Sequence, residues 1–430
     1  MSNLINLTTP APSTFCSRWI PRKATLAAWL TGPVFLRPLN ALLRRRAPII
    51  QIGRRVIVSC HADVTDALAR DTEFTISEIN TGRTNRDNGP FVLSMDRSPQ
   101  HDREKELLNR VMKREDVARI RQIVTARVQE CLDRVKPRGW MDAVEDVTRR
   151  VPLQVVGEYF GVPGPDDTVM LRWMRTLFHD LFLNLTDDKD VAQKAVTSFE
   201  EMRPYLLGWI TRRKVEIADN PGQANDDVLA RMLRCQKLPG MEWLDDDCIR
   251  RNISGLIIGA VDTTSTAAAK VIDQLLRRPK EWAEARQAAE AGDEATIARY
   301  VWEALRFNPH NPIVIRHSQP GAVIGQATSR RRTLSGGQMV YLGTSSAMFD
   351  PAVFPDPGSF RTDRDPAHYL HFSSGIHACQ GRYVSGIQIP LIVAGILRLA
   401  DVHRASGWDG RIAYDGPFPD RMILKFSART

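Results

Sequence analysis

Apolar and polar residues alternate with two different periods along this chain, which separates expected strands from expected helices. Near the start, the apolar runs Pro48 to Ile52 and Val56 to Cys60 flank a Gly-Arg-Arg turn, which predicts a hairpin; a helix is expected next, over Asp63 to Arg70. The chain is then polar and Asn-rich from Ser77 to Asn88. From about Pro99 to Pro137 apolar residues recur at helical spacing, and helices are expected to dominate up to residue 310.

The longest helical pattern begins after the triplet Asp245-Asp246-Asp247 and can run to Arg278, where Pro279 stops it. Acidic residues favour the first turn of a helix, and proline ends one. At 1.5 Å per residue such a helix spans roughly 50 Å. A helix that crosses the whole molecule can present a functional site at its middle.

After residue 312 the pattern changes to short β-branched runs and then to an irregular Pro/Asp-rich meander from Asp350 to Pro366, with a last helix after Gly381. The β-branched runs are Ile313 to Arg316, Val323-Ile324 and Met339 to Leu342. The sum predicts a mainly α fold with a minor β portion.

Composition favours one large globular domain. Hydrophobic residues make up 43% of the 430 residues and charged residues 25%, and neither a tether nor an internal repeat divides the chain. We expect a domain over residues 46–430, preceded by a segment of uncertain structure, residues 1–45.

The cysteines and the N-terminus indicate a cytoplasmic protein. The six cysteines are far apart and form no C-x-x-C pair, which argues against a disulfide framework or a zinc module. The start, MSNLINLTTP, lacks the basic and apolar regions of a secretory signal.

A membrane span is not expected near the N-terminus. Gly32-Pro33 and Arg37-Pro38 interrupt the apolar stretch from Ala24 to Leu43, and a charge at the bilayer centre costs about 2.5–3.5 kcal/mol. Contact with a membrane surface through Arg44-Arg45-Arg46 stays open. The net charge of +9 would suit nucleic acid, an anionic membrane or an acidic protein, but no basic stripe interleaved with aromatic residues is present, so nucleic acid is not expected.

The segment from His371 to Arg382 places Cys379 between two glycines and directly ahead of the last helix. Free backbone N–H groups and the positive end of a helix favour the thiolate, which is the form that binds metal or attacks. Free cysteine is also commonly an inert buried residue, so Cys379 by itself leaves both interpretations open.

Around Cys379 the sequence resembles the heme loop of the cytochrome P450 family, F-x-x-G-x-[R/H]-x-C-x-G. The positions matched are Phe372, Gly375, His377, Cys379 and Gly381. The resemblance implies heme b as cofactor, bound through this loop, with Cys379 as the proximal iron ligand and His377 against a heme propionate. Gln380 stands where the family usually has an apolar residue, which could alter hydrogen bonding near the sulfur.

The middle of the long helix, from Gly259 to Thr264, contains small and polar residues. A helical threonine can bond its hydroxyl to the carbonyl four residues earlier, here from Thr263 to Gly259, which loosens the helix and opens a notch. Alone, the polar residues could form a solvated face or a cap. The family carries [A/G]-G-x-[D/E]-T-[T/S] here, so the resemblance implies that Asp262 and Thr263 deliver protons to bound oxygen. Ala260 replaces the usual second glycine.

Glu303 and Arg306 lie three residues apart on a helix, a spacing that is common on helix surfaces. Their position between the two motifs matches the family's buried E-x-x-R ion pair, for which Arg361 or Arg364 would supply the further arginine. The resemblance implies a structural role in the heme-binding core.

The resemblance also implies partners for the heme propionates. Arg316 follows the E-x-x-R helix in a strand that commonly carries a propionate-binding arginine in the family. His101 and Lys105 stand at H-x-x-x-R, with lysine in place of arginine, and a lysine lacks the bidentate fork of a guanidinium. Lys105 could equally be a surface charge on an amphipathic helix.

The preferred hypothesis is a monooxygenase that inserts one atom of O2 into an apolar small molecule such as a terpenoid, a fatty acid or a polycyclic compound. No flavin or nicotinamide motif is present, so a separate ferredoxin or flavodoxin is expected to donate electrons, attracted by a basic face that includes Lys113, Arg114 and Arg382. The alternatives are an enzyme that uses peroxide or rearranges a hydroperoxide, and a non-catalytic heme sensor or ligand carrier. The candidate pocket walls are Ile79 to Ser94, Leu177 to Leu185 and Ile313 to Ile315.

Overall fold

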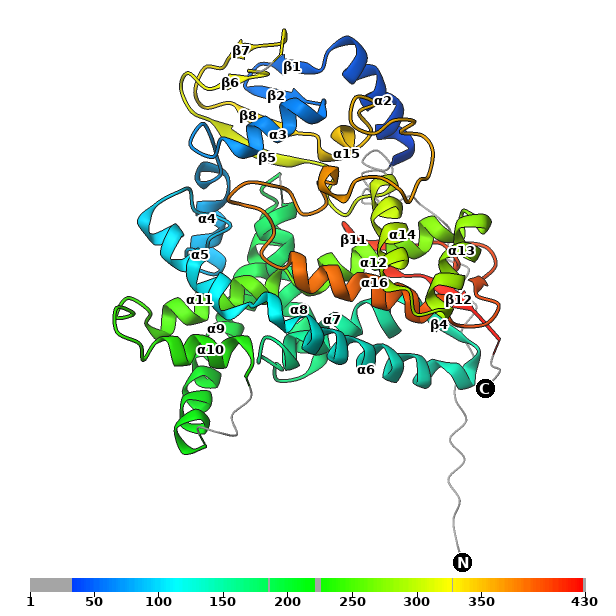
Figure 1. Cartoon of the computed structure of the whole chain (residues 1–430). Coiled ribbons are helices and arrows are strands. Elements are labelled where there is room, and N and C mark those ends of the chain that lie inside the picture. Colours follow the sequence, from blue (N-terminus) through cyan, green and yellow to red (C-terminus); the bar gives the residue numbers. More distant parts are fainter. Residues whose placement is uncertain (1–32, 185, 221–225, 327, 428–430) are drawn as a thin grey trace, which may run out of the picture.

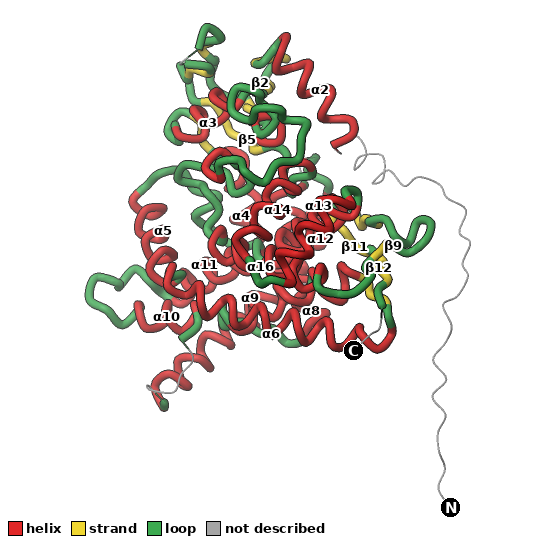
Figure 2. Tube along the Cα trace, turned by 45° about the vertical axis from the view of Figure 1, so that its right-hand side comes forward, coloured by secondary structure: helices red, strands yellow, loops and turns green. Residues whose placement is uncertain are grey.

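The structure, a computed structural model, describes residues 33–184, 186–220, 226–326 and 328–427. Most of the molecule is a helical body, and a smaller part rich in strands lies at one end of it (Figure 1). Figure 2, coloured by secondary structure, shows the same division after a 45° turn, with helices throughout the body and most strands gathered at two of its edges. The fold is therefore mainly α with a minor β portion, as the sequence predicts.

Helices run through the whole described chain. The helices are α2 (Pro33–Arg46), α3 (His61–Ala69), α4 (Ser77–Asp87), α5 (Pro99–Val111), α6 (Val117–Val135), α7 (Arg150–Glu158), α8 (Asp167–Phe178), α9 (Lys189–Asp219), α10 (Val228–Cys235), α11 (Asp246–Ile258), α12 (Val261–Leu276), α13 (Pro279–Glu290), α14 (Glu294–Phe307), α15 (Thr344–Ala347) and α16 (Arg382–Leu397), with short turns η1 (Arg114–Asp116), η2 (Lys136–Arg138), η3 (Ala143–Thr148), η4 (His179–Leu183) and η5 (Pro366–His368).

The largest sheet joins strands that are distant in sequence, in the order β1-β2-β8-β5-β3. Its strands are β1 (Ile49–Ile52), β2 (Arg55–Val58), β3 (Phe74–Thr75), β5 (Val314–Ser318) and β8 (Met339–Leu342). The pairing of β2 with β8 is parallel and the other pairings are antiparallel. The smaller sheets pair β4 (Trp140–Asp142) and β9 (His403–Arg404) with β12 (Ile423–Lys425), β10 (Ala413–Asp415) with β11 (Phe418–Arg421), and β6 (Val323–Ile324) with β7 (Arg332–Thr333).

The N-terminal hairpin and the helix after it form as the sequence predicts, within one or two residues of the expected ends. The polar, Asn-rich stretch that follows contains α4, which its composition does not predict. Of the interrupted apolar stretch near the N-terminus, residues 24–32 lie outside the described residues. From Pro33 onward the chain forms α2, where Arg37 donates to the carbonyl of Phe307 and Arg44 to Ser346 Oγ at 2.8 Å.

The long central helix is divided. We expected one helix up to Arg278, but the structure has α11 and α12 in line, separated at Gly259-Ala260. The cause is local. The Ala260 N–H donates to Ile257 O, only three residues back, and the Thr263 hydroxyl donates to the carbonyl of Gly259, so the regular pattern of helical hydrogen bonds is interrupted here. Together α11 and α12 form the one helix in the described chain that is long and apolar enough to cross a membrane, yet 72% of its apolar window is buried inside the fold, which fits a core helix.

Helix α16 brings the C-terminal loop to the middle of the body. It packs against α6, α12 and α14. A Cβ on Gly395 would stand 2.3 Å from Val128 Cγ1, so this glycine lets α16 and α6 approach closely. Because α16 begins directly after the Cys379 loop, its packing fixes that loop beside the central helix.

Candidate active site

The Cys379 loop is anchored at both ends. Gly375 has a φ of +75°, and a Cβ there would stand 2.2 Å from the carbonyl oxygen of Leu68 in α3, so only glycine fits. The Cys379 N–H donates to Phe372 O at 2.9 Å. The turn therefore holds the backbone of Cys379 in a defined position at the start of α16.

The Cys379 side chain is exposed to a hollow rather than packed in the core. Although the residue is exposed, the protein around the sulfur desolvates the thiol and raises its pKa, while the Gly381 N–H, Lys105 and Arg382 act in the opposite direction. The hollow has a volume of about 430 Å³. Its lining includes Arg97, His101, Lys105, Gly375, Ala378, Cys379 and Arg382. Asp102 and Glu106 line the hollow as well, but the charges that lower the pKa of the thiol are those of Lys105 and Arg382. A thiol that faces an open space next to such cations is suited to bind a metal centre as the thiolate.

Two histidines and an arginine gather beside this loop, and several of their polar atoms have no hydrogen-bond partner. His101 Nε2 and both ring nitrogens of His377 are buried with no hydrogen-bond partner, and the two rings lie 5.9 Å apart. Burial lowers the pKa of His377 to about 3, with Arg316, His101 and Lys105 adding to the effect. Arg316 is buried and donates only to the carbonyl of Ile315, at 2.9 Å. Buried donors without acceptors fit the carboxylates of heme propionates.

At the break in the central helix, the Thr263 hydroxyl donates to Gly259 O at 2.6 Å, the bond that the sequence predicts. Gly259, Ala260 and Thr263 stay half-buried, although the residues on either side of them are buried. The break is therefore a small opening in an otherwise closed helix.

Asp262 points away from solvent and is held by a residue that the sequence did not indicate. Its carboxylate lies 3.3 Å from the guanidinium of Arg175 in α8. Burial raises the pKa of Asp262, and Arg175 and Arg149 oppose that effect. Arg175 also lies within 3.7 Å of Asp415 and 3.5 Å of Asp420. Pairing between segments so far apart in sequence leaves no local pattern by which it could be recognised.

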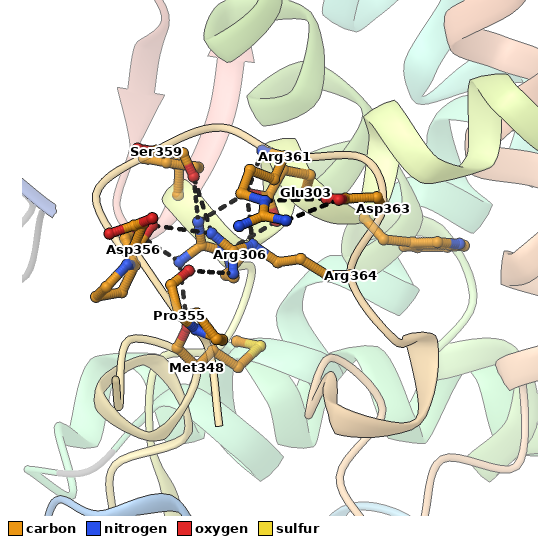
Figure 3. Close-up of polar contacts among 12 residues, drawn as sticks. Glu303, Arg306, Met348, Pro355, Asp356, Ser359, Arg361, Asp363 and Arg364 are labelled. Atoms are coloured by element: carbon orange, nitrogen blue, oxygen red, sulfur yellow. Dashed lines mark hydrogen bonds and ion pairs between the residues drawn. The ribbon is translucent and has the colours of Figure 1, made fainter. Parts of the chain in front are cut away.

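The predicted E-x-x-R pair forms and is fully buried. Arg306 donates to both carboxylate oxygens of Glu303, at 2.7 and 2.8 Å (Figure 3). Arg364 donates to Glu303 at 3.2 Å, whereas the Arg361 side chain turns to Asp363 and only its backbone N–H reaches Glu303. The sequence left Arg361 and Arg364 as candidates for the third member of the cluster, and the structure shows that it is Arg364.

The same cluster holds the meander. Arg306 donates to the carbonyls of Met348, Pro357 and Ser359, and Arg364 to those of Pro355, Asp356 and Ser359. Figure 3 shows these contacts converging on Arg306 and Arg364 from one irregular loop. This loop leads into the Cys379 segment. The two guanidinium groups therefore hold the backbone that precedes the candidate iron ligand in place.

The predicted basic residues line a groove next to the Cys379 loop. Lys113, Arg114 and Arg382 share it with Gln380 and Tyr383, and its volume is about 430 Å³. Gln380 donates to Asn109 in α5 at 3.1 Å, so its polar side chain ties the loop to that helix.

Two of the three predicted pocket walls come together. Asn80, Phe91 and Ser94 meet Leu181 and Phe182 across Gly255 and Ile258 of α11, around a cavity of about 10 Å³ that would hold roughly one water molecule. Leu185 lies outside the described residues. The third segment does not line this cavity, and Ile313 is exposed.

Comparison with known proteins agrees with this fold and loop. A model of the cytochrome P450 family matches residues 50–411. The fold is that of a heme-thiolate oxygenase. The chain belongs to the cytochrome P450 family, is an oxidoreductase of the monooxygenase type, and has heme b as its cofactor.

Individual relatives are distant. The chain is 26% identical to a steroid C26-monooxygenase of Mycolicibacterium smegmatis over 77% of this chain and 76% of that one. It is 28% identical to a cyclomarin C epoxidase of Salinispora arenicola over 68% and 69% of the two chains. Among solved structures, CalO2 is similar at a TM-score of 0.76 and 21% identity over 92% of this chain and 96% of that one, which shows the fold.

Proposed function

We propose that this P450 inserts one atom of O2 into an apolar small molecule, with electrons from a separate ferredoxin or flavodoxin. The observation that carries the proposal is the half-buried Thr263 in an otherwise buried helix, next to a buried acid, in a fold whose Cys379 loop faces a hollow and lies beside imidazole nitrogens that have no hydrogen-bond partner. We further propose a cytoplasmic protein with its oxygenase domain over residues 46–430, preceded by an N-terminal segment, residues 1–45, whose described part lies in α2 and is bound to the domain through Arg37 and Arg44.

Different residues of this chain would bind different parts of the heme. Cys379 would ligate the iron, and Phe372 and Gly381 would shape the loop that supports it. His101, Lys105, Arg316 and His377 would hold the propionates, with Lys105 as a point charge. When bound, the heme supplies an iron at which O2 is reduced and one oxygen atom is transferred to the substrate. Glu303, Arg306 and Arg364 would keep the loop in place.

Asp262 and Thr263 would move protons. Burial raises the pKa of Asp262, so its carboxyl can hold a proton at a higher pH than an ordinary aspartic acid. The Thr263 hydroxyl donates its hydrogen to the Gly259 carbonyl, so the hydroxyl oxygen is free to accept a hydrogen bond from a water at the helix break. Arg175 keeps the Asp262 side chain beside α8 until the carboxyl exchanges that partner for water.

The groove lined by Lys113, Arg114 and Arg382 would receive the electron donor. A basic surface attracts an acidic partner and raises its association rate. We expect turnover with an acidic ferredoxin to fall as salt rises from about 0.05 to 0.5 M, because the Debye length shrinks. Turnover that does not change with salt would count against this docking site.

The proposal is tested first by the spectrum of the reduced protein with carbon monoxide. The wild type is expected to show a strongly red-shifted Soret band that Cys379→Ser abolishes and that the control Cys235→Ser retains. Turnover under isotopically labelled O2 should then place one labelled oxygen atom in the product. A histidine-type spectrum that Cys379→Ser does not alter, or product without label, would overturn the proposal.

A further inference from the structure

Lys270 is a cation inside the fold that lacks a carboxylate partner. Its Nζ donates to the carbonyl of Pro309 at 2.8 Å, and no carboxylate of the described residues lies within 4.0 Å of it. Asp273, the one acid that raises its pKa, is already bound by Arg277 and Arg404. Protein surrounds Lys270 closely enough that burial lowers the pKa of its ammonium to about 8. Its other two N–H donors have no partner in the described structure.

Lys270 opens to the same side of α12 as Thr263. In the described stretch 261–270, Thr263 and Lys270 are half-buried and every other residue is buried. The two are seven residues apart, a spacing that places side chains on one face of a helix, about 10 Å apart along the axis. Thr263 and Lys270 are therefore the two residues of this stretch that are not fully enclosed, and they lie on one face of α12.

Aromatic side chains lie next to this cation. His310 follows Pro309, and Lys270 lowers the pKa of its ring further, after burial, so the two groups are close. Its Nδ1 is buried without a partner, and its ring lies 6.3 Å from that of Phe178. Phe178 in turn lies 5.0 Å from Phe182, which belongs to the cavity by α11, and 6.2 Å from Phe418. A row of aromatic rings therefore leads from this cavity to the His310 ring, whose Nδ1 has no partner, and to the neighbouring Lys270, which has one carbonyl partner.

The energetics favour an anionic ligand group at Lys270. A charge taken out of water costs several kcal/mol unless an opposite charge or hydrogen bonds compensate it. One carbonyl is a small compensation, and a carboxylate could accept from the remaining ammonium N–H groups and from the imidazole. Arg316 shows the same combination of burial and missing counter-charge where the heme propionates are proposed to bind.

We propose that Lys270 and His310 form a subsite for the carboxylate of an otherwise apolar substrate, so that the natural substrate is an amphipathic carboxylic acid. This inference rests on the proposed monooxygenase function and narrows it. With its carboxylate at Lys270, a molecule that spans about 10 Å would present its distant carbons at Thr263. Lys270 then determines which substrates bind and which carbon is oxidised, without taking part in oxygen chemistry.

The test is substrate binding to the holoenzyme, followed by the spin-state shift of the Soret band. Three matched pairs of acid and alcohol cover the apolar skeletons: dodecanoic acid and dodecanol, citronellic acid and citronellol, and abietic acid and abietinol. In the wild type at least one acid should bind about 10-fold more tightly than its alcohol, because a charge-assisted hydrogen bond is gained.

Lys270→Met should remove that preference and leave binding of the alcohol within about 2-fold, and Lys270→Arg should restore part of it. The control is Lys280→Met in α13, where an exposed lysine pairs weakly with Glu284. The carbon monoxide spectrum of each variant reports thiolate ligation separately, so failure of the heme assignment is distinguishable from failure of the subsite.

Three outcomes would overturn the subsite. In the first, no acid binds more tightly than its alcohol in the wild type. In the second, the preference survives in Lys270→Met. In the third, Lys270→Met loses heme, which would assign the ammonium to a propionate.

Discussion

Glu303 and Arg316 are both buried charged side chains in the C-terminal half of the chain, but their surroundings differ. Glu303 receives hydrogen bonds from two arginines and from Tyr369, and every oxygen of its carboxylate is used. Arg316 donates to its neighbour's carbonyl, while Asp96, the acid that raises its pKa, is bound to Ile76 and Ser77. We infer that Glu303, whose hydrogen bonds are all made within the protein, stabilises the fold. Arg316 lacks a counter-charge within the protein, so it can bind an anionic ligand group.

The largest effect is expected at the satisfied cluster. Glu303→Gln leaves Arg306 and Arg364 buried without a counter-charge, which should lower the free energy of unfolding by about 3–5 kcal/mol. Urea denaturation measures it. The control is Glu290→Gln, which breaks a more exposed pair with Arg286, four residues away on α13, and should cost less than about 0.5 kcal/mol. Equal losses in the two variants would remove the distinction.

Arg316→Leu, unlike Glu303→Gln, should not lower the stability of the apoprotein. Removal of an unpaired buried cation should leave the apoprotein as stable as the wild type or more so, yet heme affinity should fall by roughly 10-fold to 100-fold, because a charge-assisted bond is worth about 1.5–3 kcal/mol. Heme transfer to apomyoglobin and denaturation of the apoprotein give the two values. A less stable apoprotein that binds heme normally would show that Arg316 is structural.

A buried acid pair provides a pH-dependent case between these extremes. Asp87 and Asp180 are both buried and hydrogen-bonded to each other and to Arg86, and burial followed by this contact raises the pKa of Asp87 to about 7. The folded state therefore holds a proton that the unfolded state releases near pH 4, so stability should fall as pH rises through 7, by on the order of 2 kcal/mol.

Asp87→Asn mimics the protonated form and should flatten this slope, making the variant more stable than the wild type at pH 8. Thermal unfolding at pH 5 and pH 8 measures the difference. Asp133→Asn serves as control, because the pKa of that exposed carboxyl is lowered by Lys136 and Gln129. A slope that persists in Asp87→Asn would assign the proton elsewhere.

The smallest effect on stability is expected at Thr263. Its hydroxyl bonds within its own helix, so Thr263→Ala should change the free energy of unfolding by less than about 0.5 kcal/mol. Product formed per electron pair should nevertheless fall about 10-fold or more, since proton delivery is impaired while heme binding is kept. Oxygen uptake compared with product yield measures this coupling. A fully coupled variant would remove the proposed role.

The features that the sequence predicts well are those encoded locally. Cys379, the Glu303–Arg306 pair and the bond from Thr263 to Gly259 each depend on spacing within one loop or helix. The break in the central helix was missed because a single periodic pattern runs through both halves. Arg175, His310 and the choice of Arg364 over Arg361 could not be predicted, since each depends on how segments far apart in sequence meet in space.

The parallel pairing of β2 with β8 has a consequence for how the protein is made. The two strands, residues 55–58 and 339–342, are separated by 280 residues. The candidate ligand loop packs against the carbonyl of Leu68 at Gly375, so it too needs the N-terminal part of the chain. At about 5–20 residues per second, the ribosome needs roughly 15–60 seconds to supply the second strand after the first. During that time the hairpin has an unpaired edge, which can bind other chains. Cofactor capture is thus expected after chain release, and chaperone supply should limit the yield of holoenzyme.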